Sequence, residues 1–134
     1  MKEISAGAIV YTYIDDLRYY LLIKDNHGNY GFPKGHLEKD ETETEAAIRE
    51  IKEETNIDIT LDTSFREVLN YIMPNGIEKE VIYYLGYYHN QNTIKQPGEI
   101  EEILLLPYED TLNTLTFDNM KQVLIKAERC LNNE

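Results

Sequence analysis

Short runs of small, β-branched and aromatic residues recur along the chain and predict a series of β-strands. Turn signals separate these runs, among them Asp15-Asp16, the segment 25–29 and Pro74-Asn75-Gly76, which is typical of a tight hairpin turn. A polar loop is expected over residues 90–98. The strands themselves are expected at residues 4–13, 19–23, 30–33, 57–61, 65–73, 78–88 and 103–106.

Two other segments have the spacing of helices. Thr42 followed by Glu45 forms a capping box, which predicts a helix from about residue 43 to residue 55, and Asn56 suits the left-handed position past its end. Thr116 opens a second helix, whose apolar residues recur at steps of three or four and form a core stripe. That stripe comprises Phe117, Met120, Leu124, Ala127 and Leu131.

Strands mixed with two helices predict an α/β protein whose mixed sheet is covered on both faces, an α/β/α sandwich. The 134 residues, 42% hydrophobic and 28% charged, fit a single domain over 1–134 with one core. The longest strongly apolar runs, such as 103–106, are too short to cross a membrane, and the Met1-Lys2-Glu3 start lacks the apolar segment of a signal peptide. We therefore expect a soluble, cytoplasmic protein without a membrane partner, and the sequence leaves its oligomeric state open.

The net charge of −12 bears on the partners of the protein. Binding nucleic acid through many phosphates requires clustered Lys and Arg, so we expect no stable nucleic-acid binding. An anionic substrate must then be received by metal ions and a few local cations.

Cysteine and histidine offer little chemistry in this chain. Cys130 is the only cysteine, which excludes an internal disulfide and a cysteine-based zinc site within the chain, and we expect a buried, unreactive thiol. His27, His36 and His89 have no partner at metal-ligand spacing and are expected to be structural.

The helix predicted at 43–55 crowds three carboxylates together. At about 100° per residue, with Ile51 at zero, Glu54 falls at about −60°, Glu50 at about −100° and Glu53 at about −160°. Like charges three and four apart on a helix repel by roughly a few tenths of a kcal/mol per pair. Glu54 and Glu50 should lie at the border of the buried face, because they adjoin its apolar arc. That arc comprises Ala47, Ile51 and Ile48.

A solvated acidic face is the ordinary explanation of such a charge run. A cation site is favoured here because the acids adjoin the apolar arc, a glycine-led loop precedes the helix, and no Lys or Arg alternates among the three to neutralise them. Hard oxygen ligands of this kind suit Mg²⁺ or Mn²⁺, with phosphate oxygens of the substrate completing the shell. Such ions activate water and polarise phosphoryl oxygens, so hydrolysis of a phosphoanhydride is the matching chemistry.

One segment of the chain closely resembles the signature of the Nudix hydrolases. Gly35 is followed after five residues by Glu41 and after seven more by the run 49–57, Arg49-Glu50-Ile51-Lys52-Glu53-Glu54-Thr55-Asn56-Ile57. The signature covers 23 residues, and the order of flanking strands and the C-terminal helix also resembles the family. The chain departs from it at Asn56, where the family has glycine. Asparagine tolerates a left-handed backbone, so we expect the fold and activity to survive.

The resemblance implies hydrolysis of a nucleoside diphosphate linked to another group, with water attacking phosphorus. By this analogy Glu50 and Glu54 ligate the divalent cations, the backbone carbonyl of Gly35 is a further ligand, and Glu53 ligates or activates water. The same analogy implies a Nudix-type sandwich fold.

The resemblance also assigns roles outside the ligand set. Glu41 would act in the outer shell, and Arg49 would hold the loop carboxylates through a salt bridge, with a purely surface Arg49 as the alternative. A catalytic base in this family can also come from a loop outside the signature, and Glu99, Glu101 and Glu102 occupy a suitable place. For each of these three singly, an exposed surface position is the alternative.

Three further runs look like the branch of the family that hydrolyses diadenosine tetraphosphate asymmetrically, to ATP and AMP. They are residues 32–38, 66–71 and 79–84. Residue-by-residue matching makes Lys34 and Lys79 phosphate contacts. The same matching makes Tyr83 a platform for adenine, although an aromatic residue on a strand is more often core packing.

Other activities remain open at this point. Bacterial RNA 5′-pyrophosphohydrolases share the signature, although the acidic charge counts against them. Release of pyrophosphate from nucleoside triphosphates is a further enzymatic alternative. A catalytically silent module that binds a nucleotide is the non-enzymatic one, but degenerate modules typically lose signature glutamates, and this chain keeps them.

Overall fold

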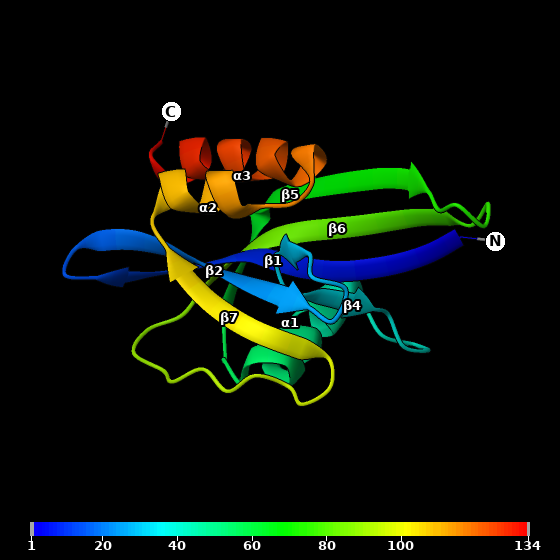
Figure 1. The fold of residues 1–134 in the computed structure, drawn as a ribbon, viewed down its shortest axis with the longest axis horizontal. Coiled ribbons are helices and arrows are strands. Elements are labelled where there is room, and N and C mark those ends of the chain that lie inside the picture. Colours follow the sequence, from blue (N-terminus) through cyan, green and yellow to red (C-terminus); the bar gives the residue numbers. More distant parts are fainter. Residues whose placement is uncertain (1, 134) are drawn as a thin grey trace.

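A mixed seven-stranded sheet lies between helices on its two faces (Figure 1). The computed structural model describes residues 2–133. The elements, in chain order, are β1 (Lys2–Ile14), β2 (Leu17–Asp25), β3 (Tyr30–Gly31), β4 (Lys34–His36), α1 (Glu43–Thr55), β5 (Thr60–Ile72), β6 (Glu78–Tyr87), β7 (Ile100–Leu106), α2 (Tyr108–Thr114) and α3 (Asp118–Leu131).

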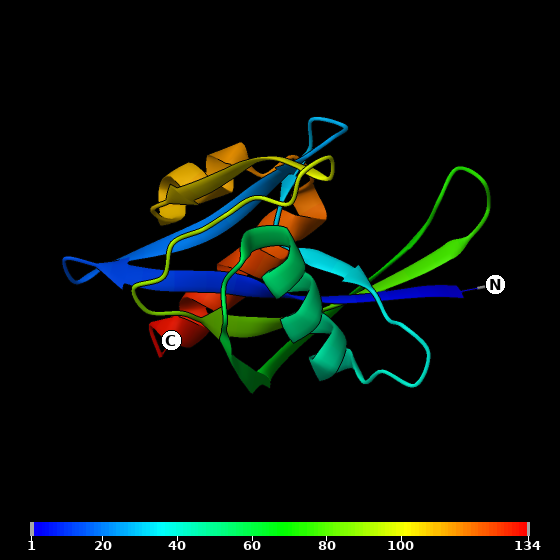
Figure 2. The same cartoon turned by 90° about the horizontal axis from the view of Figure 1, so that it is seen from below.

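The strand β1 runs through the middle of the sheet. It pairs in parallel with β6, from Lys2 opposite Glu78 to Tyr11 opposite Tyr87. Its other edge is shared, because β4 pairs antiparallel with residues 5–7 and β2 pairs antiparallel with the C-terminal end. The strand β7 extends the sheet beyond β2, and β5 extends it beyond β6. Strands β2 and β4 therefore pair with two different segments of the same edge of β1. The short strand β4 lies beside α1 (Figure 2).

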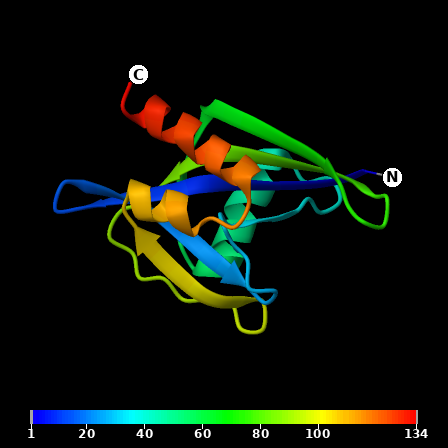
Figure 3. The ribbon, with the colours of Figure 1, turned by 45° about the horizontal axis from the view of Figure 1, so that its top comes forward.

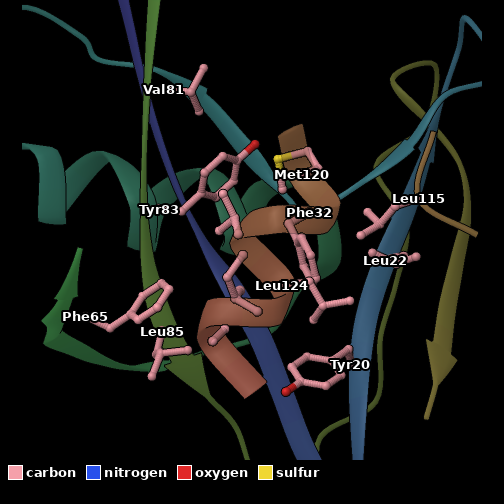
Figure 4. Packing of buried hydrophobic residues seen from close by; sticks show 13 residues of the cluster. Tyr20, Leu22, Phe32, Phe65, Val81, Tyr83, Leu85, Leu115, Met120 and Leu124 are labelled. Carbon is pink, nitrogen blue, oxygen red and sulfur yellow. The ribbon is translucent and has the colours of Figure 1, made fainter. Parts of the chain in front are cut away.

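Alternate residues of β1 enter the two layers of core. Ala6, Ala8 and Val10 belong to the clusters on the α1 side of the sheet, whereas Ile9 belongs to the cluster on the α3 side. On that side α3 crosses over the sheet (Figure 3) and packs against it through an apolar stripe, shown from close by in Figure 4. The buried residues of the stripe are Met120, Val123, Leu124 and Ala127.

Local signals place α1 where the sequence predicts it. The helix spans Glu43–Thr55, the reciprocal hydrogen bonds of the capping box between Thr42 and Glu45 are both present, and Asn56 is left-handed with φ of 65°. Side chains from β5 and β6 also fix the first turn. The Tyr84 hydroxyl donates to Glu43 Oε1 at 2.7 Å, and Arg66 Nη2 donates to both oxygens of the same carboxylate at 3.0 and 3.1 Å. The sandwich with a mixed sheet is thus confirmed.

Three expectations about the secondary structure were wrong. A third helix, α2, exists because the Thr111 hydroxyl and backbone close a turn on Pro107, although the segment has no repeating apolar stripe to predict it. The strands expected at 57–61 and 65–73 are one strand, β5, whose pairing with β6 shifts register between Asp62 and Glu67. Gly35 lies in a strand rather than a loop, since β4 pairs with β1.

Three expectations about burial were also wrong. Phe117, expected in the core stripe, precedes α3 as its N-cap residue and is 52% exposed. Cys130 is exposed, because the buried face of α3 passes through Val123, Leu124 and Ala127 instead. Ile48 is 42% exposed, because α1 turns Ala46 toward the sheet in its place. The buried arc of α1 is therefore rotated from the predicted centre toward the glutamates.

Replacing Thr42 with Ala is expected to lower the free energy of unfolding by about 1 kcal/mol, because the hydroxyl that caps the Glu45 N–H is lost. Urea unfolding followed by circular dichroism measures the change. Thr42→Ser keeps the hydroxyl and should retain most of the stability. Equal stability of the Ala variant and the wild type would show that the cap contributes nothing measurable here.

Candidate active site

The site lies where the middle of α1 approaches β4. Gly35 on β4 faces the carboxylate of Glu50, and a Cβ at this position would overlap that carboxylate. Only glycine allows the helix to approach the strand this closely, and it leaves the backbone of Gly35 beside Glu50. The first residue of the predicted signature is thus brought into contact with its central helix.

Arg49 joins the loop, the strand and the helix at this point. Its Nε and Nη2 donate to the two oxygens of Glu41 at 2.7 and 2.9 Å, and Nη2 also donates to the His36 carbonyl at 3.0 Å. Nη1 donates to Glu50 at 2.8 Å and to Glu53 at 3.1 Å. The salt bridges predicted for Arg49 are present, and it is not a free surface residue.

The hydrogen bonds of Arg49 shift the pKa values of Glu41 and of Arg49 itself, and both shifts favour the charged forms. Hydrogen bonds from Arg49, with a further one from the backbone of Glu38, hold the pKa of Glu41 at about 2. The same contacts, that with Glu41 first, raise the pKa of Arg49 above its ordinary value. Glu41 and Arg49 are therefore a fixed ion pair at neutral pH.

The pKa values of Glu54 and Glu50 are instead raised. Burial, followed by the charge of Glu50, raises the pKa of Glu54 to about 8, although the backbone N–H of Lys34 donates to its carboxylate. Burial is also the largest cause that raises the pKa of Glu50. Glu54 Oε1 is buried and accepts no hydrogen bond among the described residues. A buried carboxylate oxygen with no partner is costly unless a donor or a cation meets it.

The oxygen atoms of Glu50, Glu53 and Glu54 are chemically suited to a divalent cation, but their side chains are not arranged around one position. Within residues 2–133, no group of three or more His, Cys, Asp or Glu side chains lies close enough together to hold a metal ion as the side chains stand. One oxygen each of Glu50 and Glu53 is turned to Arg49. The unpartnered Glu54 oxygen and the Glu50 carboxylate beside Gly35 are the hard oxygen donors that such a cation prefers.

Lys34 lies near these carboxylates, and Lys79, on the α3 side of the sheet, lies near Lys34. Burial, and then the charge of Lys79, lower the pKa of Lys34, while Glu54 opposes the shift. Among the described residues, Lys34 has no hydrogen bond or ion pair for its ammonium group. The sequence identified these two lysines by resemblance alone, and their contact with phosphate stays a prediction.

Tyr83 does not present its ring to a ligand in this structure. It is 2% exposed and packs with Met120 and Phe32 in the cluster under α3 (Figure 4). The predicted stacking on adenine therefore stays a prediction that this conformation does not meet. A residue not singled out from the sequence, Tyr71, is 36% exposed, lies opposite Lys79, and lines with it a hollow of about 440 Å³.

The loop between β6 and β7 is tied to the C-terminal end of α1. The Ile94 N–H donates to the Thr55 carbonyl at 3.0 Å, and the Gln96 N–H donates to the Glu54 carbonyl at 3.2 Å. No sequence pattern in this polar loop signals these bonds. Of the three candidate bases, Glu99 ends this loop, whereas Glu101 and Glu102 lie on β7 rather than in the loop predicted for them. All three are exposed, and Glu101 forms an ion pair with Lys24 at 3.7 Å.

The comparison with known proteins places this geometry in a family. The NUDIX domain family matches residues 2–126. The chain belongs to this family, and it is a Nudix hydrolase. Nudix hydrolases generally use a divalent metal ion and act on small nucleotides. Within residues 2–133, no helix combines the length and apolar character needed to cross a membrane.

Among individual relatives, the chain is similar to asymmetrical bis(5′-nucleosyl)-tetraphosphatases. It is 29% identical to the protein of Caenorhabditis elegans, over 91% of each chain. It is 31% identical to that of Mus musculus, over 84% of this chain and 80% of the relative. The crystal structure of a binary complex of C. elegans Ap4A hydrolase superimposes with a TM-score of 0.90 at 28% identity, covering 98% of this chain and 99% of that one.

Replacing Arg49 with Gln is expected to lower the melting temperature, and to lower it less as the pH falls. Because the pKa of Glu41 is depressed from 4.5 to about 2, its contribution to stability is complete above about pH 4.5 and is lost as the pH falls toward 2. The variant lacks this contribution, so the difference in melting temperature is widest at neutral pH and narrows toward pH 3.

Thermal unfolding from pH 7 to pH 3 measures this difference. Arg129→Gln, an exposed arginine on α3, is the matched control and should leave the melting temperature nearly unchanged throughout. A difference for Arg49→Gln that stays constant over the whole range would contradict the role given to the Glu41 ion pair.

Proposed function

We propose that this protein hydrolyses diadenosine tetraphosphate to ATP and AMP in the presence of Mg²⁺. The observation that carries the proposal is the position of Glu50 beside Gly35 and of Glu54 near Lys34, in a chain similar to Ap4A hydrolases over nearly its whole length. RNA 5′ ends and nucleoside triphosphates are the competing substrates, and a silent nucleotide-binding module is the non-catalytic alternative.

Four groups of the chain would hold the metal, with Mn²⁺ as the alternative to Mg²⁺. They are the carboxylates of Glu50, Glu53 and Glu54 and the backbone carbonyl of Gly35. The bound ion supplies Lewis-acid polarisation of the phosphate oxygens and a more acidic water. The raised pKa of Glu54 supports this assignment, because burial without a cation disfavours the charge that the ligand role requires.

Glu53 is the residue we assign to the attacking water. Its side chain is 45% exposed, the most open of the three glutamates, and Arg49 Nη1 fixes its position from the preceding turn. Its carboxylate takes a proton from water as the oxygen bonds to phosphorus, and the P–O bond to the leaving phosphate breaks. Arg49 and Glu41 act by holding this helix and loop, and neither touches the substrate. A carboxylate outside the signature, Glu99 in the loop or Glu101 or Glu102 on β7, is the alternative base.

Lys34 and Lys79 would contact the phosphate chain. Burial, and then the charge of Lys79, lower the pKa of Lys34, which is half-buried and has no partner for its ammonium group among the described residues. A polyphosphate placed between them relieves this repulsion, which favours an anionic ligand at a protein with net charge −12. These two cations also favour a substrate with several phosphates over one with a single phosphate.

Incubation with diadenosine tetraphosphate and Mg²⁺ is expected to yield ATP and AMP in equal amounts, measured by ion-exchange chromatography. Glu53→Gln should lower kcat by a factor of about 10² or more with little change in KM, because it removes an interaction of the transition state. Glu109→Gln, an exposed glutamate on α2, is the matched control and should keep full activity.

The outcome of that assay separates the alternatives. Two ADP molecules as product, or no turnover at micromolar enzyme, would contradict the proposal. Faster turnover of triphosphorylated RNA or of a nucleoside triphosphate would move the assignment to that substrate. A fully active Glu53→Gln variant would transfer the water-activating role to a glutamate outside the signature.

Mg²⁺ is expected to raise the melting temperature, with about 2.7 kcal/mol of stabilisation at roughly 100 times its dissociation constant. Glu54→Gln removes a buried carboxylate, so the variant should lose most of this Mg²⁺ effect while remaining at least as stable as the wild type in EDTA. Mg²⁺ affinity should weaken as the pH falls through about 8, because protons then compete for Glu54. Equal Mg²⁺ shifts in both proteins would exclude Glu54 as a ligand.

A further inference from the structure

Two buried side-chain atoms within residues 2–133 lack a hydrogen-bond partner, Glu54 Oε1 and Ser5 Oγ. The first has a role in the proposed cation site. The second belongs to a residue that no motif singled out and that the proposed mechanism does not use. Ser5 is fully buried in β1.

The register of the sheet places Ser5 beside the candidate active site. On one side of β1 it lies opposite His36 of β4, and on the other side opposite Val81 of β6. Alternation along β1 points its side chain to the face that carries Ile9, which packs under α3. Ser5 thus lies on the α3 side of the sheet, one strand away from Gly35.

The same face carries the two lysines proposed for the phosphates. Gly7, two residues along β1, lies opposite Lys34, and a Cβ on Gly7 would overlap Cβ of Lys34, so the lysine side chain leaves on this face. Lys79 is opposite Glu3, two residues before Ser5, and shares the face of Val81. Lys34 and Lys79 are therefore diagonal neighbours of Ser5 on the two flanking strands, a spacing that long side chains can reach across. His36, directly opposite Ser5, is in an ion pair with Glu3 at 3.4 Å.

An unpaired buried hydroxyl is unusual in this chain. Thr12, on the same strand, donates to the Tyr88 carbonyl at 2.7 Å, and Thr55 donates to the Ile51 carbonyl at 2.6 Å. Alanine would fill the space of Ser5 without leaving a polar atom unsatisfied. The unsatisfied Ser5 hydroxyl lowers the stability of the folded chain, but it places a hydrogen-bond donor between Lys34 and Lys79.

We propose that Ser5 is a substrate-binding residue, whose hydroxyl donates to a phosphate oxygen of the bound nucleotide, directly or through one buried water. A hydroxyl can donate to an oxyanion, and such a charge-assisted bond is stronger than a neutral one. Because Ser5 is covered, this oxygen or water must lie beneath the flexible side chains of Lys34 and Lys79. This inference rests on the proposed function, since it concerns the phosphates of the same site.

Ser5→Ala tests the inference with Thr12→Val as the matched control. Calorimetric titration with ATP and Mg²⁺ is expected to show a dissociation constant about tenfold higher for Ser5→Ala, with a melting temperature equal to or above that of the wild type. Thr12→Val removes a paired hydroxyl from the same strand, so it should lower the melting temperature and leave the dissociation constant unchanged. The KM for diadenosine tetraphosphate should follow the ATP dissociation constant, with kcat reduced less.

A dissociation constant for Ser5→Ala within twofold of the wild type would overturn the inference, as would a parallel loss in Thr12→Val. If the wild type fails to hydrolyse diadenosine tetraphosphate but Ser5→Ala still weakens ATP binding, the proposed function fails and the role of Ser5 stands. A wild-type chain that binds no ATP overturns both.

Discussion

The site depends on the hydrogen bonds that the Arg49 guanidinium donates to three carboxylates and one carbonyl. Its donors reach Glu41 in the loop, Glu50 and Glu53 on the helix, and the carbonyl of His36 in β4. A planar fork of five N–H groups can serve several acceptors at once, which a lysine cannot do. Without it, the acidic side of α1 would repel the loop that has to lie beside it.

The helix also places charge where stability alone would place apolar groups. Its buried arc includes Ala46 and Ile51 on either side of Glu50 and Glu54, while Ile48 faces solvent. Burial raises the pKa of both glutamates, and one Glu54 oxygen has no partner. Local conflicts of this kind are typical of functional sites, because a ligand resolves what the folded chain alone does not.

Features with a local signal could be predicted from the sequence, and features that join distant segments could not. The capping box of Thr42 and the left-handed Asn56 depend on neighbouring residues, so the bounds of α1 follow from them. The bonds from Tyr84 and Arg66 to Glu43 link residues far apart in the chain and have no sequence signature. The exposure of Ile48 has the same origin, because the sheet decides which side of the helix is covered.

The parallel pairing of β1 with β6 has a consequence for how the protein is made. The N-terminal strand, which supports Gly35 through β4, has its other edge filled by residues 78–87. During synthesis on the ribosome, this edge of β1 therefore stays unpaired until residues 78–87 have emerged. Such long-range parallel pairing closes slowly, so all residues of α1 are synthesised well before the sheet that orients this helix has formed.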